Sequence, residues 1–192
     1  MSATNAPFGF RPVYHPSGNI VANLYEPTVA TNAAIYQGDP VILTGATSVC
    51  IIAVGTGGSP GLVAGVFAGC EYVDVDGKPT YKPYWPGSTS GATNIKFWVY
   101  DQLDLVFEVQ AAGSLANTSI ADSADYTYAA GSTYTGISAS YLSTTLAGAA
   151  TSKQFRIIGL GQQVDNAWSD AYTVVRVQIA QNMRFTPVNS IA

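Results

Sequence analysis

Short runs of alternating side chains constrain this 192-residue chain most, because they fit β-strands and no long helical stripe accompanies them. In residues 95–100 every second position is apolar, and residues 103–110 repeat the pattern. The apolar positions are Ile95, Phe97 and Val99 in the first run and Leu103, Leu105, Phe107 and Val109 in the second. With a turn at residues 101–102, the two runs are predicted to form a hairpin with one buried side.

Four more segments are rich in β-branched and aromatic residues and are predicted to be strands. They span residues 41–44, 48–53, 155–160 and 172–179. A helix of about three turns is expected only at residues 138–148, ending at Gly148. Residues 111–152 contain no Lys or Arg and are mostly small, so we expect a long loop or small subdomain there. The predicted class is all-β, a sandwich or barrel-like body with long loops and little helix.

Residues 1–40 are predicted to form an extended N-terminal arm, and residues 41–192 a single β-rich domain. Prolines recur through the arm and disfavour helix. They are Pro7, Pro12, Pro16, Pro27 and Pro40. Large apolar residues between them indicate that the arm lies on something, either its own body or a neighbouring chain. Because Phe8 and Phe10 are two residues apart, an extended arm would point both rings into one groove, and Gly9 would allow close backbone approach.

Charged residues make up only 10% of the chain, and the net charge is −4. Such a chain lacks the basic surface that nucleic acid binding needs. No apolar run approaches the ~18 residues that span a bilayer, so no membrane partner is expected. The N-terminus shows no signal peptide, which favours a protein made and used on the cytosolic side of a cell. A neutral surface is typical of chains that pack against other chains.

No catalytic, cofactor or metal site is predicted. His15 is the only histidine and lies between prolines, a poor platform for a general base. Asp74-Val75-Asp76-Gly77 lacks the spacing of a calcium loop and fits a turn between two strands. Cys50 and Cys70 with one histidine cannot supply four zinc ligands, and both are expected to be reduced thiols.

An aromatic cluster runs through the middle of the sequence. Its members are Tyr72, Tyr81, Tyr84, Trp85, Trp98 and Tyr100. Such rings serve sugar-binding platforms, subunit interfaces or cores. Because no charged or amide side chains are concentrated beside them in the sequence, an interface or core role is favoured over sugar binding.

Several segments resemble a family of small virion structural proteins of tailed phages, regarded as capsid decoration or cement proteins. They are residues 6–13 (APFGFRPV) with His15 and Gly18, 38–41 (GDPV), 65–72 (GVFAGCEY), 84–87 (YWPG), 104–110 (DLVFEVQ) and 165–168 (DNAW). The segments at 6–13 and 65–72 are the most specific. The family carries no assigned active site, and residues 111–152 show no clear match.

The resemblance implies a non-enzymatic protein on the outer capsid surface of the virion, assembled in the host cytoplasm. Its partners would be the major capsid protein and itself, as a homotrimer, and no cofactor is expected. The predicted interface residues are Phe8, Phe10, Arg11, Tyr14, Tyr72, Tyr84 and Trp85. Two alternatives remain open. One is a tail or fibre component that binds a receptor or glycan through the Tyr/Trp cluster, and the other is a hydrolase with an unrecognised site.

Overall fold

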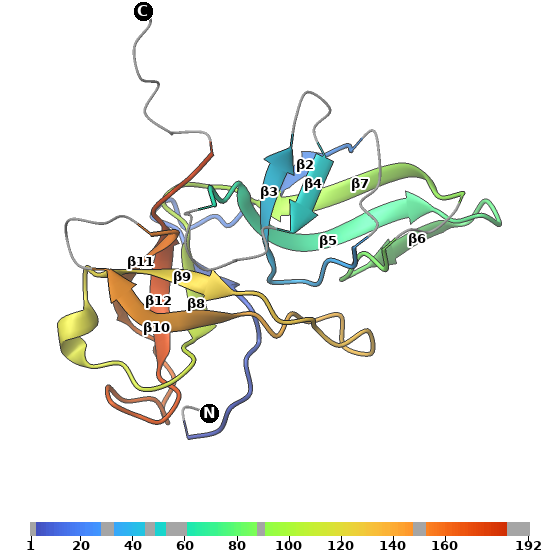
Figure 1. Cartoon of the computed structure of the whole chain (residues 1–192). Helices are drawn as coiled ribbons and strands as arrows, with labels where there is room; N and C mark the ends of the chain where they lie inside the picture. Colours follow the sequence, from blue (N-terminus) through green and yellow to red (C-terminus); the bar gives the residue numbers. More distant parts are fainter. Residues whose placement is uncertain are drawn as a thin grey trace, which may run out of the picture.

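The structure, a computed structural model, describes residues 3–27, 33–44, 49–52, 61–87, 91–147 and 153–183, with only the backbone of residues 44 and 49–52. Among the residues that the structure describes, 45% are in strands and 2% in helix, and two antiparallel sheets form a sandwich-like body (Figure 1). The predicted all-β class is therefore confirmed. The four separate strand predictions are also confirmed, with ends that differ by a few residues.

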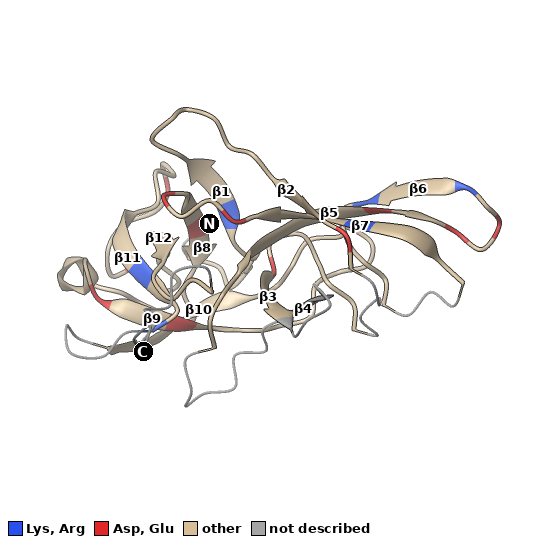
Figure 2. Cartoon of the chain, turned by 90° about the horizontal axis from the view of Figure 1, so that it is seen from above, with Lys and Arg blue, Asp and Glu red and all other residues tan. Residues whose placement is uncertain are grey.

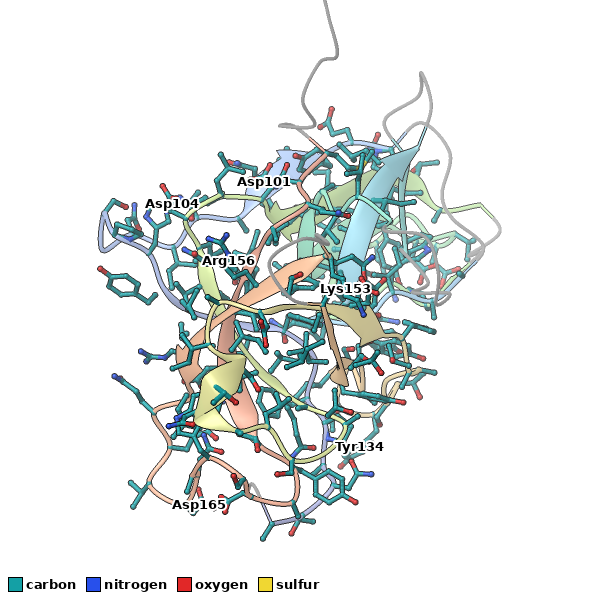
Figure 3. All side chains as sticks on the ribbon, turned by 60° about the vertical axis from the view of Figure 1, so that its left-hand side comes forward. Asp101, Asp104, Tyr134, Lys153, Arg156 and Asp165 are labelled. Atoms are coloured by element: carbon teal, nitrogen blue, oxygen red, sulfur yellow. The ribbon has the colours of Figure 1, made fainter. Side chains whose placement is uncertain are left out.

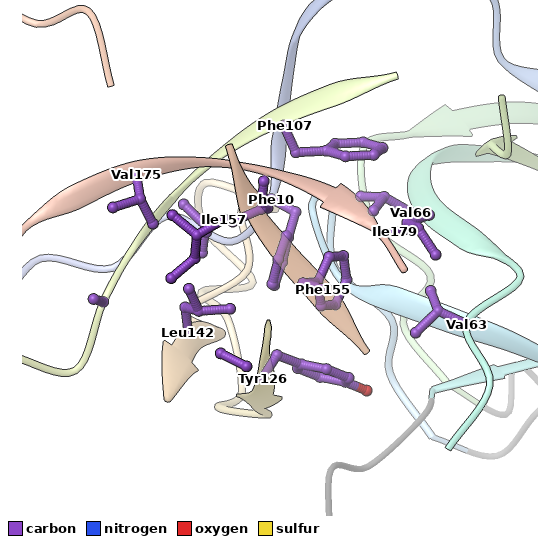
Figure 4. Packing of buried hydrophobic residues seen from close by; sticks show 14 of the residues in the cluster. Phe10, Val63, Val66, Phe107, Tyr126, Leu142, Phe155, Ile157, Val175 and Ile179 are labelled. Carbon is purple, nitrogen blue, oxygen red and sulfur yellow. The ribbon is translucent and has the colours of Figure 1, made fainter. Parts of the chain in front are cut away.

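Sheet A has six strands in the order β1-β8-β12-β11-β9-β10. Their bounds are β1 Arg11–Tyr14, β8 Val106–Gln110, β12 Val174–Ile179, β11 Phe155–Leu160, β9 Ser123–Thr127 and β10 Tyr141–Ala147. One face of this sheet covers the larger apolar core, to which Phe10, Phe107, Leu142, Phe155 and Ile157 belong (Figure 4). Alternation explains the packing, since odd-numbered residues of β8 and β12 face this core.

Sheet B has the order β2-β7-β5-β3-β4, and β6 pairs with the second half of β5. The bounds are β2 Asn23–Tyr25, β7 Thr93–Tyr100, β5 Gly65–Val73, β3 Pro40–Thr44, β4 Val49–Ile52 and β6 Pro79–Lys82. The ends of β5, β6 and β7 extend together away from sheet A (Figure 1). A second core lies under this sheet and contains Phe67, Tyr72, Trp85 and Phe97.

The predicted hairpin of residues 95–100 and 103–110 is wrong. The first run is β7 of sheet B, paired with β2 and β5, whereas the second contains β8 of sheet A, paired with β1 and β12. The chain crosses between the sheets at Asp101, which is 1% exposed. Asp101 accepts hydrogen bonds from Asn23 Nδ2 at 2.6 Å and from the Tyr25 hydroxyl at 2.5 Å. These bonds from β2 hold the crossing point.

Strand β8 is buried on both faces, which its alternating sequence does not indicate. The polar face is covered by distant segments. Gln110 accepts a hydrogen bond from the backbone N–H of Ala6 at 2.9 Å and donates one to the carbonyl of Thr4 at 3.0 Å. The backbone N–H of Gln162 donates to Glu108 at 3.2 Å. Burial of polar residues is thus matched by hydrogen bonds.

Residues 111–152, expected to be a long loop or small subdomain, contribute β9 and β10 to sheet A. The helix expected at residues 138–148 is wrong, because residues 141–147 form β10. Leu142 and Leu146 are four apart, a spacing that fits one face of a helix and equally one face of a strand. Both contact the larger core, so the pairing with β9 decides between the two. A 3-10 turn at Asn117–Ser119 is the one helical element in the described ranges.

The N-terminal arm does not stand apart from the body. Its β1 pairs with β8 in sheet A and its β2 pairs with β7 in sheet B. Phe10 is 1% exposed and stacks on Phe155 with ring centroids 4.3 Å apart. Of the two alternatives for the arm, the structure shows that it lies on its own body.

Residues 35–40 connect the arm, both sheets and the loop before β10. The Phe10 N–H donates to the carbonyl of Gly38, and the Gly38 N–H donates to that of Phe67, each at 2.9 Å. At the centre lies Asp39, which is fully buried. Its carboxylate accepts hydrogen bonds from the hydroxyls of Ser138 at 2.5 Å and Ser140 at 2.9 Å. This network ties the start of β3 to the start of β10.

Candidate functional site

Reactive groups are sparse on this protein. Charged side chains are scattered along both sheets (Figure 2). Within the described ranges, no three His, Cys, Asp or Glu side chains are placed to hold a metal ion. The described part of the chain also holds no helix with the length and apolarity that a membrane crossing requires.

The surroundings of the single residues with possible chemistry indicate structural roles. His15 Nδ1 lies 2.7 Å from the Ser17 hydroxyl, a contact within one local turn. The Asp74–Gly77 turn is confirmed as the loop between β5 and β6, where the Gly77 N–H donates to the Asp74 carbonyl at 2.9 Å. Burial raises the pKa of the Cys70 thiol to about 12, so this thiol is protonated and unreactive at neutral pH. The side chain of Cys50 lies outside the described residues.

The aromatic cluster of the sequence is divided between the two faces of sheet B. Tyr72 is 3% exposed and Trp85 is fully buried, so of the two roles expected for them, interface or core, these two residues have the core role. Their rings meet edge to face at 5.3 Å, and Trp85 also contacts Phe97. The reason is the alternation of β5 and β7, which turns these positions toward the second core.

Three of the other rings lie on the opposite face of sheet B, where Tyr100 also packs against the larger core. Trp98 and Tyr100 are half-buried, and Tyr81 is 68% exposed. They line a cavity of about 390 Å³ whose floor includes Ala68. We call this the aromatic groove, defined by Ala22, Gln37, Ala68, Glu71, Tyr81, Trp98 and Tyr100.

Small residues make the aromatic groove possible. Gly69 pairs with Trp98 across the strands, and a Cβ added at Gly69 would come within 3.1 Å of the Tyr81 hydroxyl oxygen. The Tyr81 side chain therefore crosses the sheet over Gly69, beside Ala68. Burial raises the pKa of Tyr100, and the nearby Tyr81 adds to the rise. The Tyr100 hydroxyl is therefore a neutral hydrogen-bonding group at physiological pH.

Two polar side chains from distant positions reach the aromatic groove. Glu71 lies opposite both Tyr81 and Lys96 in the strand register. Gln37 comes from the segment that connects the two sheets, and its backbone is held by the Gly136 carbonyl at 2.9 Å. The fold thus supplies the amide and the carboxylate that the sequence did not show beside the rings.

A second cavity of about 340 Å³ shares Gln37 and Tyr100 with the aromatic groove. Phe8, Phe10 and Arg11 line it from the sheet A side. Phe8 is half-buried, whereas Phe10 belongs to the core of its own chain, so the Phe10 ring is not exposed to a partner. Gly9 has φ +71°, which breaks the extended geometry from which a shared ring direction was predicted.

Arg11 is half exposed and its guanidinium lies 5.1 Å from the Phe8 ring centroid. It donates a hydrogen bond of 2.9 Å to Glu108, and Arg176 Nε lies 3.6 Å from the same carboxylate. Burial alone would raise the pKa of Glu108. The hydrogen bonds from Arg11 and Gln162, with the two nearby arginine charges, outweigh burial and lower it. Glu108 therefore remains ionised, and Arg11 is held at the rim of the second cavity.

The remaining predicted interface residues differ in exposure. Tyr14 is 53% exposed, whereas Tyr84 is half-buried and stacks on Tyr36 at 5.9 Å. The sequence-based interface prediction left out Gln37 and Glu71. Alternation in residues 95–100 could have indicated that Trp98 and Tyr100 share the face opposite Phe97. Tyr134 is 97% exposed on the loop before β10, and no pattern in the sequence indicated this exposure (Figure 3).

No family model matches this sequence, and no curated protein or solved structure shows a significant match.

Proposed function

We propose that this chain is a capsid decoration protein of a tailed phage, which binds the outer shell and strengthens contacts between units of the major capsid protein. The resemblance of residues 6–13 and 65–72 to that family suggests the role. The sparse charge and the all-β body support a protein that acts by adhesion rather than by catalysis.

The observation that carries this proposal is a set of four exposed apolar side chains in the segment where the arm passes from sheet A to sheet B. Tyr14 is 53%, Ile20 37%, Val21 41% and Leu24 43% exposed. We call these four residues the linker strip. Grouped apolar exposure of this kind marks protein contact sites. Attachment through the linker strip leaves the buried part of the arm within its own fold.

Replacing Tyr14 and Ile20 together with serine is expected to weaken binding to expanded empty capsids of the cognate phage by about tenfold or more. Both side chains are exposed, so the melting temperature should change little. Co-sedimentation with capsids measures the loss. Val75→Ser is the matched control, because Val75 is 63% exposed at the β5–β6 turn, outside the linker strip. Equal binding by the double variant and the control would contradict the proposal.

A homotrimer is the expected assembly, as the family resemblance implies. Several identical footholds on one oligomer would raise capsid avidity, because each further contact is effectively intramolecular. Native mass spectrometry should give about three times the 20.1 kDa chain mass. A monomer at every accessible protein concentration would count against this assembly.

A further inference from the structure

We infer that the aromatic groove is a binding site for a neutral oligosaccharide. This inference goes beyond capsid attachment, for which the linker strip is responsible in the proposal above. Its basis is the placement of three rings, one amide and one carboxylate around a single cavity.

The rings offer the apolar part of such a site. The C–H face of a pyranose ring is apolar and slightly positive, and it stacks on the negative face of an aromatic ring. Trp98 and Tyr100 are both half-buried, lie two residues apart on β7 and line the cavity, and Tyr100 also packs against the larger core. Tyr81 reaches the same cavity from β6. Ring positions on paired strands are fixed by the sheet, which limits the entropy lost on binding.

The polar side chains of the aromatic groove can form hydrogen bonds with sugar hydroxyls. A side-chain amide donates and accepts, and a carboxylate accepts from two hydroxyls at once. Among the residues that the structure describes, neither the Gln37 amide nor the Glu71 carboxylate forms a hydrogen bond or ion pair with another side chain. Gln37 is nevertheless held in place, because Ser138 donates its N–H to the Gln37 carbonyl at 2.9 Å.

The electrostatics favour an uncharged ligand. The one acidic side chain of the aromatic groove, Glu71, lies opposite Lys96 in the register of β5 and β7. The two opposite charges leave little net field at this end of the cavity. An anionic polymer would need several cationic groups, and a cationic ligand would need more acidic ones. Stacking and hydroxyl hydrogen bonds are therefore the recognition chemistry that these side chains offer.

The backbone argues against a bound peptide strand. Extended peptides are commonly recognised by pairing with the free edge of a sheet. The aromatic groove lies on the face of sheet B, and β5 at its floor pairs with β7 on one side and with β3 and β6 on the other. Those backbone groups are already used within the sheet. A sugar needs only the ring faces and the side-chain polar groups.

The test is a binding measurement with the full chain and a panel of neutral oligosaccharides built from glucose, galactose, mannose and N-acetylglucosamine. We expect at least one to bind with a Kd below about 1 mM and to change the Trp98 fluorescence. Trp98→Ala and Tyr81→Ala should each weaken binding about tenfold or more, and Glu71→Gln less, because the amide keeps one acceptor. Tyr134→Ala is the control, since Tyr134 is 97% exposed and does not line the aromatic groove.

Three results would overturn the inference. They are absence of binding across the panel, binding that Trp98→Ala and Tyr81→Ala leave unchanged, and loss of capsid binding in these variants without any sugar binding. The last result would assign the aromatic groove to the capsid contact. Tyr81 is largely exposed, so Tyr81→Ala remains informative even if Trp98→Ala fails to fold. Capsid co-sedimentation without sugar tests the proposed function separately.

Discussion

Deletion of residues 1–14 is expected to unfold the protein rather than to remove a separable arm. The deletion takes Phe10 out of the larger core, where its ring contacts both Phe155 and Tyr126. It also removes β1 from the edge of sheet A, together with the ion pair between Arg11 and Glu108. The loss of a buried phenylalanine alone costs about 3–5 kcal/mol, a large part of the ~5–15 kcal/mol that holds a typical domain folded.

Two phenylalanines of the same segment provide the matched comparison. Phe10→Ala should lower the free energy of unfolding by about 3–5 kcal/mol, because it opens a cavity in the core. Phe8→Ala should cost much less, since Phe8 is half-buried at the rim of the second cavity. Circular dichroism melts and urea titrations measure both variants and the deletion. A truncated protein that keeps the melting temperature of the full chain would contradict the assignment of Phe10 to the core.

Asp39→Ala is expected to lower the free energy of unfolding by about 3 kcal/mol. The substitution leaves three buried donors without their acceptor, namely the hydroxyls of Ser138 and Ser140 and the backbone N–H of Tyr36. Each unsatisfied buried donor costs about 1–3 kcal/mol, and relief from burying the carboxylate offsets part of the sum. For a chain of this length the melting temperature should fall by about 6–12 °C.

The pH dependence of Asp39 has a definite sign. Burial raises the pKa of Asp39 above its usual 3.8, although three hydrogen bonds oppose the rise. The folded protein therefore holds this proton more tightly than the unfolded chain. The contribution of Asp39 to stability is complete below pH 3.8 and declines as the pH rises through the folded pKa. Glu108, whose pKa is lowered, acts in the opposite direction, because its contribution is lost as the pH falls.

Asp39→Asn separates the loss of the hydrogen-bond acceptor from the loss of the titrating group. The amide oxygen can still accept from both serine hydroxyls, so the loss of stability should be smaller than in Asp39→Ala. The variant cannot titrate, so the difference in unfolding free energy between wild type and variant should depend on pH above 3.8. Denaturant titrations at several pH values measure that difference. A difference that does not change with pH would show that Asp39 is not the titrating group.

The results expected for Phe10 and Asp39 bear on how the protein would attach to a partner. If Phe10 and Asp39 hold the arm on the body, attachment cannot depend on a free N-terminal segment. Under the proposed function, the linker strip, which lies in and between β1 and β2, is then the part of the arm that would contact a capsid. A substitution in the linker strip should change capsid binding without unfolding the chain. A substitution of Phe10 or Asp39 should lower stability instead.

Alternation and β-branched or aromatic content predicted strands β3, β4, β7, β8, β11 and β12, because side-chain direction along a strand depends only on local backbone geometry. Alternation predicted that Phe97 and Val99 share a buried face, and both are fully buried. The sequence pattern gave a wrong prediction at Leu142 and Leu146, where a spacing of four residues fits both a helix face and a strand face. It also gave a wrong prediction where one backbone angle interrupts the extended geometry. Gly9 is such a case, since its positive φ departs from the extended geometry that alternation assumes between Phe8 and Phe10.

The partners of each strand were decided only by the tertiary structure, because pairing depends on contacts between residues far apart in the chain. Thus β7 and β8, neighbours in the sequence, belong to different sheets. The same reason governs the candidate site. Gln37 and Glu71 come beside Trp98 only when β5 pairs with β7 and residues 35–40 cross between the sheets. The sequence alone determined the strands with strong local signals, and long-range packing determined the remaining strands and which side chains share a cavity.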